Sequence, residues 1–558
     1  MAKEPQELLL KLDQQALIDL WYDPSLGLSE VFGSRKRHDA EILFETMVGY
    51  FDEQLLAQRP IRNALLYAHK TPTNKLLEEF NETRTASNGN KLTRSFDDWE
   101  DQLYKKWVAG GPWARSFCRA FRLDPKYAGY KAEPRPQSLE VLEAYEPLEP
   151  LLEFQEDLSN RIFKRICRKP AGRSMATLPT GAGKTRTMID AILRFQAERP
   201  GVVLWIATTS EVCEQAAKAY KRSYENCAPS FGSAVQRFWG DSYKLRGNFS
   251  QGLLVAGIQK LYSQIEESEV LREMIKKHVT LVVFDEAHHA TAPTYKQTLN
   301  TICELRKRPR VPLIGLTATP GKGTDADGEG VRKLAKFFDC DLLQSKQLKN
   351  KKLPIQWLQG QKVLSKVDKL NVAGEKNIKL TAEEKKHMLK FSSFSPELLE
   401  RVGKIPGRNT KILRHGSDTQ KTLVFACDTL QAHLLAHEWR KRYDNKNIAR
   451  SITAETPYAL RRRWLQEFMD TESELKIIVN VGVLTTGFDA PKVERLILAR
   501  PTMSRVLFEQ MVGRGLRGPL FGGYESCKVI DIVDSFTNFG GIKAAAAFEH
   551  AWLKGKHL

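Results

Sequence analysis

The stretch 178–185, Leu-Pro-Thr-Gly-Ala-Gly-Lys-Thr, constrains the fold of this chain more than any other feature. Its small residues allow the backbone to curl with its N–H groups turned inward around an anion. Apolar residues at near-helical spacing over residues 185–195 predict a helix directly afterwards, whose positive end would face a bound phosphate. Lys184 would then reach the β- and γ-phosphates of a nucleoside triphosphate, and the Thr185 hydroxyl would hold Mg²⁺.

The alternative is a glycine-rich turn that happens to precede a helix, with Lys184 exposed. Leu178 occupies the first glycine position of the general phosphate-loop pattern, so that pattern is incomplete. Motifs farther along the chain nevertheless favour the phosphate loop. The residues predicted to hold the nucleotide in this loop are Thr180, Gly181, Ala182, Gly183, Lys184 and Thr185.

The distribution of apolar residues predicts an α/β fold with two parallel-sheet domains in tandem, preceded by a mainly helical N-terminal domain. Short, nearly continuous apolar runs are typical of strands buried on both faces of a parallel sheet. They occur at 202–207, 253–256, 281–284 and 313–316, and again at 422–426, 476–480, 496–499 and 528–533. We expect domains at residues 1–140 (helical), 146–340 (first α/β), 341–416 (connector or insertion) and 417–558 (second α/β).

Charge and cysteine usage restrict the function further. Lys and Arg number 86 against 67 Asp and Glu, a formal net charge of +19, which predicts nucleic acid as the main partner; a merely soluble basic enzyme is the alternative. The 8 cysteines form no Cys-x-x-Cys pair, so we expect no zinc site and a reducing compartment. Without a leader-like start or a long apolar run, the chain is expected to be cytoplasmic and not membrane-bound.

Two segments outside the α/β domains have patterns with two interpretations. Residues 104–131 interleave aromatic and basic residues, which could stack bases, but amphipathic helices with aromatics in a core are favoured. A proline-containing linker is predicted at 133–136. In the connector, Lys346, Lys349, Lys351 and Lys352 could contact a nucleic-acid backbone or simply face water, and helix starts are predicted at Thr381–Glu384 and at 395–397.

An acidic pair, Asp285 and Glu286, ends the apolar run 281–284 about a hundred residues after the phosphate loop. Ligands of parallel sheets bind at the carboxyl ends of strands. Asp285 could therefore hold Mg²⁺, while Glu286 orients and deprotonates the water that attacks the γ-phosphate. Alone, such a pair is often just a loop; after a phosphate loop it indicates nucleotide hydrolysis.

Three later motifs complete the set. Thr317-Ala318-Thr319-Pro320 ends the next strand, where its hydroxyls could bridge a nucleotide site and a nucleic-acid groove, or merely cap a turn. The segment 487–491 is a tight turn. Arg514 and Arg517 lie three residues apart on what we expect to be one side of a helix-like segment, and either could neutralise charge that develops on the γ-phosphate. Exposed arginines on a glycine-rich loop are the alternative.

Taken together, six segments resemble, in order and spacing, the motifs of superfamily 2 DEAH-box helicases and translocases. They are Phe154-Gln155, 178–185, 285–288, 317–319, 487–491 and 510–517, and the resemblance covers about residues 146–540. The forms of these motifs look most like the branch that holds the motor subunits of type I and type III restriction enzymes and related bacterial defence and repair helicases. The resemblance implies two RecA-like domains with ATP between them.

The resemblance also implies roles for individual residues. Gln155 would read adenine, and His288 and Gln510 would link the two domains near the γ-phosphate. Lys184, Asp285, Glu286, Gln510, Arg514 and Arg517 would be catalytic, with Thr185 and Asp285 on Mg²⁺ and Gly487 and Asp489 at the nucleotide. Nucleic-acid contacts would come from Thr208, Gln259, Thr319, Thr485 and Thr486.

The function expected from these observations is an ATP-dependent DNA helicase or double-strand translocase, with ATP and Mg²⁺ as cofactors. Bacterial anti-phage defence or DNA repair is the expected setting, and any nuclease would be a separate partner chain. The alternatives are an RNA helicase, an ATP-gated nucleic-acid sensor that signals to a partner without moving, and a structural scaffold that binds nucleic acid without turnover.

Overall fold

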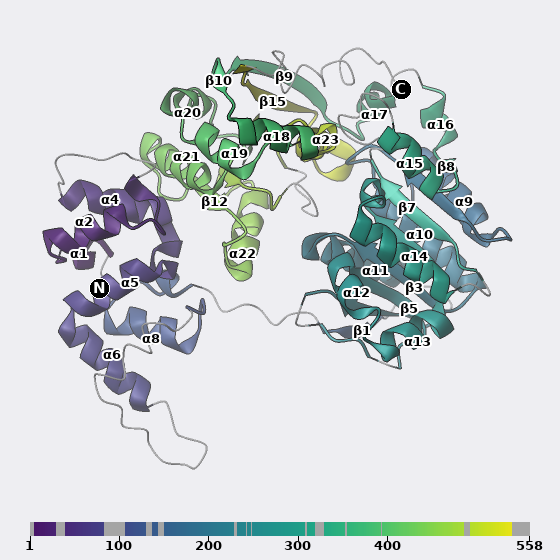
Figure 1. Cartoon of the computed structure of the whole chain (residues 1–558), viewed down its shortest axis with the longest axis horizontal. Coiled ribbons are helices and arrows are strands. Elements are labelled where there is room, and N and C mark those ends of the chain that lie inside the picture. Colours follow the sequence, from purple (N-terminus) through teal and green to yellow (C-terminus); the bar gives the residue numbers. More distant parts are fainter. Residues whose placement is uncertain are drawn as a thin grey trace. The chain divides into compact units, whose positions relative to one another are not determined.

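Figure 1 shows the computed structural model of the chain, which consists of two compact units. The first unit comprises Met1–Arg135, Pro396–Val483 and Ile497–Arg500, and the second comprises Pro136–Ser395, Leu484–Leu496 and Pro501–Leu558. The structure describes residues 5–9, 11–29, 40–82, 107–129, 137–142, 150–227, 231–240, 243–246, 248–306, 310–318, 329–351, 354–391, 393–484 and 492–537.

The amino-terminal part of the first unit is helical. Its elements are α1 (Pro5–Leu9), α2 (Gln14–Tyr22), α4 (Ala40–Phe51), η1 (Asp52–Ala57), α5 (Arg59–Ala68), α6 (Lys70–Glu82), α8 (Pro112–Ala120) and η3 (Pro125–Ala128). Asp13 accepts a hydrogen bond from the Ala16 amide at 2.7 Å and so begins α2 as a separate helix. Leucines and aromatic residues from these helices form one buried core.

The aromatic residues of the interleaved segment lie in this helical core. Phe117 stacks on Phe121 with ring centroids 4.4 Å apart, and Trp107 packs edge-on against Phe117 at 5.8 Å. The Arg62 guanidinium lies over the Trp107 ring at 4.9 Å and also donates to the carbonyls of Leu56 and Ala57. The interpretation as amphipathic helices is therefore confirmed for residues 107–129, while residues 104–106 and 130–131 lie outside the described part.

The remainder of the first unit is a parallel α/β arrangement. Strand β13 (Ile477–Asn480) pairs in parallel with β12 (Ala449–Ile452) on one side and with β11 (Thr422–Phe425) on the other. All three strands are buried; β11 and β13 are mainly apolar, whereas β12 contains the buried polar residues Arg450 and Ser451. The helices of this part are α19 (Pro396–Gly403), α20 (Pro406–Leu413), α21 (Thr429–Arg442) and α22 (Tyr458–Met469).

The second unit contains an eight-stranded sheet in the order β1-β4-β5-β3-β6-β7-β2-β8. Its strands are β1 (Leu139–Val141), β2 (Arg173–Thr177), β3 (Val202–Ala207), β4 (Ala234–Phe238), β5 (Gly252–Gly257), β6 (Val279–Asp285), β7 (Leu313–Thr317) and β8 (Leu342–Leu343). All neighbouring pairs are parallel except β1 with β4. The carboxyl ends of β2, β3, β5, β6 and β7 therefore lie along one edge.

Helices connect these strands. They are α9 (Glu153–Cys167), α10 (Lys184–Glu198), α11 (Ser210–Cys227), α12 (Ile258–Gln264), α13 (Glu269–His278), η4 (Ala287–His289), α14 (Pro293–Leu305) and α15 (Glu329–Phe337). Residues 202–207, 253–256, 281–284 and 313–316 all fall within strands, and so do 422–425, 477–480, 496–498 and 528–533 of the later runs. The predicted α/β class with two parallel-sheet domains is confirmed.

The second unit continues with α16 (Lys346–Lys349), α17 (Pro354–Gly360), β9 (Lys366–Ala373), β10 (Ile378–Lys379) and α18 (Ala382–Phe391). Later come β14 (Arg495–Leu498), which spans the boundary between the units, α23 (Arg505–Gly513), η5 (Pro519–Phe521), β15 (Ser526–Val533) and β16 (Phe536–Thr537). Strand β9 pairs in parallel with β15 over its whole length, although sequence reasoning missed it.

Both predicted helix starts in the connector are confirmed. Thr381 and Glu384 form a reciprocal capping box, with the Thr381 amide donating to Glu384 at 2.7 Å and the Glu384 amide donating to Thr381 Oγ1 at 3.1 Å. Helix α19 begins at Pro396. In the described part of the chain, every helix is too short or too polar to cross a bilayer.

Candidate nucleotide-binding site

The loop between β2 and α10 has the backbone conformation of an anion cradle. Gly181 and Gly183 have φ angles of 83° and 88°, a region open to glycine and costly for other residues. Gly183 is the N-cap of α10, and the Thr187 hydroxyl donates to its carbonyl at 3.0 Å. Apolar residues on one side of α10, among them Met188 and Ile192, are fully buried, which fixes the helix so that its N-terminus opens onto the loop.

Gln155, in the first turn of α9, forms a hydrogen bond to this loop. Its Nε2 donates to the Ala182 carbonyl at 2.9 Å, and its Oε1 accepts from the Leu152 amide at 3.0 Å. A Cβ on Gly183 would lie 2.4 Å from Gln155 Nε2, so the glycine permits this close approach. The described contacts of Gln155 are thus to the loop itself, while its predicted recognition of adenine stays a prediction.

The acidic pair lies at the carboxyl end of β6. Asp285 is its last residue, and Glu286 follows with a φ of 53°, an uncommon left-handed conformation for this residue type. The Glu286 amide donates to Asp285 Oδ1 at 2.9 Å. Burial, together with the neighbouring Glu286 charge, raises the pKa of Asp285 to about 7, although Lys184 and the amide of Glu286 act in the opposite direction.

Lys184 lies among charges of both signs. Burial lowers the pKa of its ammonium, the Glu286 and Asp285 carboxylates act against that change, and the Arg514 guanidinium acts with it. An anion beside Lys184 and a cation beside Asp285 would relieve both pKa shifts, and a magnesium nucleotide brings that pair of charges. The side chains present, a hydroxyl at Thr185 and a carboxylate at Asp285, are hard oxygen ligands that suit Mg²⁺ with phosphate and water completing its shell.

His288 links the acidic pair to the next strand. Its Nδ1 lies 3.3 Å from Glu286 Oε2 and 3.2 Å from Thr317 Oγ1, and both His288 and Thr317 are buried. The His288 imidazole therefore lies between the Thr317 hydroxyl, at the end of β7, and the Glu286 carboxylate. The predicted roles of His288 and Gln510 in linking two domains stay predictions; Gln510 lies on α23, one helical turn before Arg514.

The segment after α23 packs onto the phosphate loop. A Cβ on Gly513 would lie 2.2 Å from Thr180 Cγ2, and one on Gly181 would lie 3.2 Å from Leu364 Cδ2. The expected helix-like segment through 514 and 517 is wrong, because α23 ends at Gly513. Arg517 instead forms an antiparallel bridge with Leu364, and the Leu516 carbonyl accepts a hydrogen bond from the Ser365 amide at 2.9 Å. The backbone at 516–517 therefore pairs with an adjacent segment, as in a sheet, and does not continue the helix.

Leu364 and Ser365 were not predicted as part of the site. The Ser365 hydroxyl is fully buried and donates to the carbonyls of Arg517 or Tyr524, at 2.5 Å and 2.7 Å. Only tertiary pairing shows this support, since a Leu-Ser pair after a short helix carries no sequence signal.

The predicted nucleic-acid contacts are only partly described. Thr208 follows β3 and Gln259 lies in the first turn of α12, after β5, so both occupy the sheet edge that also carries Asp285. Thr319, Thr485 and Thr486 lie outside the described residues, and so do Gly487 and Asp489, which were predicted at the nucleotide. Among the described residues, no cluster of His, Cys, Asp and Glu has the make-up of a three-ligand metal site.

Comparisons with known proteins agree with the motifs. Residues 149–322 match the family model described as "Type III restriction enzyme, res subunit", and residues 407–518 match "Helicase conserved C-terminal domain". Together these models cover the phosphate loop, the acidic pair and both arginines.

Three curated relatives are similar over large parts of the chain. IRC3, an inferred ATP-dependent helicase of Saccharomyces cerevisiae, is 26% identical over 50% of this chain and 37% of its own length. An inferred mitochondrial helicase of Schizosaccharomyces pombe, irc3, is 27% identical over 65% of this chain and 54% of its own. The EcoKI endonuclease subunit, a type I restriction enzyme of Escherichia coli, is 26% identical over 70% and 35%. The chain therefore spans well under two thirds of the length of each.

Proposed function

We propose that this chain, which belongs to the superfamily 2 helicases and translocases and is similar to restriction-enzyme motor subunits, is an ATP-driven motor that acts on DNA. The observation that carries the proposal is that the segment before Arg514 packs on the loop after β2 at Thr180, while Asp285, Glu286 and Arg514 all act on the charge of Lys184. The charge of each of these charged side chains matches one part of a magnesium nucleotide or of its hydrolysis transition state.

In this proposal the backbone amides at 180–185 and the Lys184 ammonium bind the triphosphate. Thr185 and Asp285 would hold Mg²⁺, which would supply positive charge to the triphosphate when bound. Glu286 orients the attacking water and accepts its proton, while His288 and Thr317 hold the Glu286 carboxylate in place. Arg514 neutralises charge that develops as the γ-phosphoryl group leaves, and Arg517 assists it.

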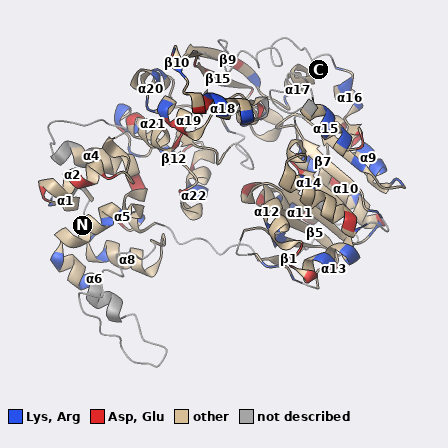
Figure 2. Cartoon of the chain, viewed as in Figure 1, with Lys and Arg blue, Asp and Glu red and all other residues tan. Residues whose placement is uncertain are grey.

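Movement follows if ATP changes the grip of the two helicase domains on a phosphate backbone. Thr208, Gln259, Thr319, Thr485 and Thr486 would supply backbone contacts. Basic residues elsewhere, such as Lys385, Lys386 and Lys390 on α18, would add attraction that is independent of sequence (Figure 2). The similarity to a type I restriction enzyme subunit favours DNA over RNA. A defence or repair setting in the cytoplasm, with a nuclease on another chain, belongs to the same proposal.

ATPase measurements with several nucleic acids test the proposal. We expect duplex DNA to stimulate hydrolysis more than single-stranded DNA or RNA, and Glu286→Gln to abolish turnover while retaining ATP binding. Hydrolysis that is stimulated only by RNA would replace the DNA motor with an RNA helicase. Stimulation by DNA with no triplex displacement would favour an ATP-gated sensor. Equal nucleic-acid binding and no turnover in wild type and Lys184→Ala would indicate a scaffold.

A further inference from the structure

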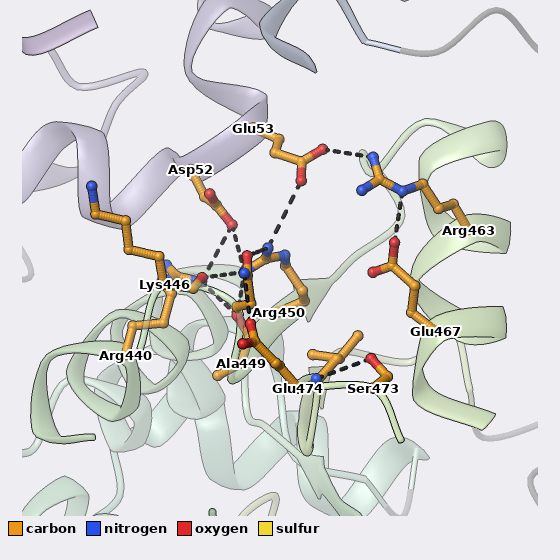
Figure 3. A network of polar contacts seen from close by, with 12 residues as sticks. Asp52, Glu53, Arg440, Lys446, Ala449, Arg450, Arg463, Glu467, Ser473 and Glu474 are labelled. Atoms are coloured by element: carbon orange, nitrogen blue, oxygen red, sulfur yellow. Dashed lines mark hydrogen bonds and ion pairs between the residues drawn. The ribbon is translucent and has the colours of Figure 1, made fainter. Parts of the chain in front are cut away.

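An acidic turn at the end of α4 contacts three arginines of the second helicase domain (Figure 3). Asp52 Oδ2 lies 3.2 Å from Arg450 Nη1 and 3.5 Å from Arg440 Nη1. Glu53 Oε2 lies 3.4 Å from Arg463 Nη1, and its Oε1 lies 3.8 Å from Arg450 Nη2. The arginines come from α21, β12 and α22, so one turn of the helical region contacts three consecutive elements of the other part.

Three of these five charged residues are buried, unlike those of an ordinary surface pair, whereas the side chains of Asp52 and Arg463 are partly exposed. Glu53, Arg440 and Arg450 are 7%, 8% and 5% exposed. Arg440 also donates to the Gly49 carbonyl of α4 and to the Ala449 carbonyl at 2.8 Å, so its guanidinium bridges both parts directly. Buried charges are strongly destabilising when one partner is removed, because water cannot replace it. Such an arrangement suits an interface that does not open.

Apolar contacts at the same interface also favour an interface that does not open. The Tyr50 ring lies 5.2 Å from the buried His433 ring, and the Tyr50 hydroxyl donates to the Leu430 carbonyl at 3.4 Å. Leu430 and Leu434, both of α21, pack against the leucine core of the helical region. A Cβ on Gly49 would lie 2.3 Å from His437 Nδ1, which shows how closely α4 approaches α21.

Along the chain, the helical region is followed by the ATP-binding sheet and not by the elements on which it packs. After the helical region, the chain enters the second unit at β1, which is antiparallel to β4 at the edge of the ATP-binding sheet. There Glu140 pairs with the buried Arg237 at 2.9 Å and also with Lys221. The helical region is thus joined by sequence to the ATP-binding sheet, but packs on α21, β12 and α22.

We infer that the helical region, meaning the described residues between 5 and 129, is a permanent part of the second helicase domain. It stays docked on the arginine-lined face of α21, β12 and α22 through the whole nucleotide cycle and is carried with that face relative to the ATP-binding domain. The docking itself is independent of the proposed function; the carried movement rests on it. The helical region is therefore placed to transmit each ATP-driven step, rather than to act as a separately tethered module.

Distance measurements between labels at exposed residues test this in the full chain. Tyr67 lies on α5 of the helical region, Tyr458 on α22 and Tyr262 on α12, and all three are exposed. Spin-labelled unnatural residues at these positions leave the native cysteines in place. We expect the 67–458 distance to be the same without nucleotide, with a non-hydrolysable ATP analogue and with added DNA, while the 67–262 and 458–262 distances change together.

A change in the 67–458 distance in any of these states would overturn the inference. If the 458–262 distance never changes, the proposed motor movement fails, but a constant 67–458 distance still supports the docking. The docking of the helical region and the proposed motor movement are therefore tested separately.

Charge reversal across the interface provides a second test. Glu53→Arg and Arg463→Glu should each broaden the 67–458 distance distribution and increase proteolysis between residues 129 and 137. The double variant Glu53→Arg/Arg463→Glu should recover only part of the wild-type behaviour, because the arginine introduced at position 53 still faces the buried Arg450. Glu273→Arg, which breaks exposed pairs with Lys276 and Lys277 on α13, is the matched control and should change neither measurement. Single variants that match wild type, or a double variant no better than the singles, would contradict permanent docking.

Discussion

Gly513 lies so close to Thr180 that a single added methyl carbon would come within 2.2 Å of the threonine Cγ2. The contact sets how near the following residue, Arg514, can come to the phosphate loop. Two segments separated by more than three hundred residues thus depend on the absence of a side chain at one position.

Gly513→Ala should therefore impair hydrolysis by displacing Arg514. We expect kcat for ATP to fall by about 10- to 100-fold, as for other small displacements of catalytic groups, with a smaller effect on ATP binding. Steady-state ATPase assays and nucleotide titration measure the two quantities. Gly407→Ala is the matched control, because a Cβ there meets no atom within 4 Å, and it should behave as wild type. Unchanged kcat in Gly513→Ala would contradict the placement of Arg514.

Gln155→Ala should weaken nucleotide binding by leaving the buried Ala182 carbonyl without its side-chain donor. A lost bond of this kind costs about 1–3 kcal/mol, which corresponds to roughly a 5- to 150-fold higher KM for ATP. If Gln155 also reads adenine, the preference for ATP over GTP should fall; if it only supports the loop, both should weaken equally. Gln251→Ala removes a comparable but exposed bond to the Gly232 carbonyl and is the control.

Arg514→Ala should lower kcat by about 10³-fold or more, because the guanidinium that neutralises charge on the γ-phosphate is lost. Arg514→Lys should recover only part of this, since an ammonium lacks the planar fork of a guanidinium. Arg517→Ala keeps the backbone bridge to Leu364, so a smaller loss is expected there. Single-turnover kinetics would separate hydrolysis from product release, and a larger loss in Arg517→Ala would reverse the assigned roles.

The docked helical region should become less stable in acid because of His433. Burial, assisted by Arg440 and opposed by Asp52, lowers the pKa of His433 to about 4, against 6.5 for an ordinary histidine. In this pH range His433 therefore binds a proton in the unfolded chain but not in the folded chain. As a result, the free energy of unfolding falls as the pH drops from about 6.5 towards 4. By pH 5 the loss from this residue is about 2 kcal/mol.

Urea unfolding at pH 7.5 and pH 5 measures this loss. His433→Gln can still bond to Ser451, whose hydroxyl lies 2.7 Å from His433 Nδ1, but it does not titrate. Its stability should therefore decrease less than that of wild type over this pH range. Equal decreases in the two proteins would show that His433 is not the source.

Sequence patterns were sufficient to predict the elements that depend only on residues close together in the chain. Helix α10, the buried strands β3, β6 and β7, and the capping box of Thr381 and Glu384 follow from local spacing and hydrogen bonding. Strand β9 escaped detection because none of its residues is buried and half of them are polar, so its composition does not distinguish it from a connector. The end of α23 at Gly513 also depends on distant partners, because the carbonyls that follow pair with residues 364–365.

By itself, the sequence determined the phosphate loop, the acidic pair and the order of the parallel-sheet domains, since each is encoded within a few consecutive residues. Only the tertiary structure decided that Gln155 supports the loop, that Gly513 packs against Thr180, and that Asp52 and Glu53 meet the arginines of α21, β12 and α22. The physical reason is distance along the chain. Burial and pairing of charges between residues hundreds of positions apart depend on which surfaces come into contact, and no local pattern specifies that.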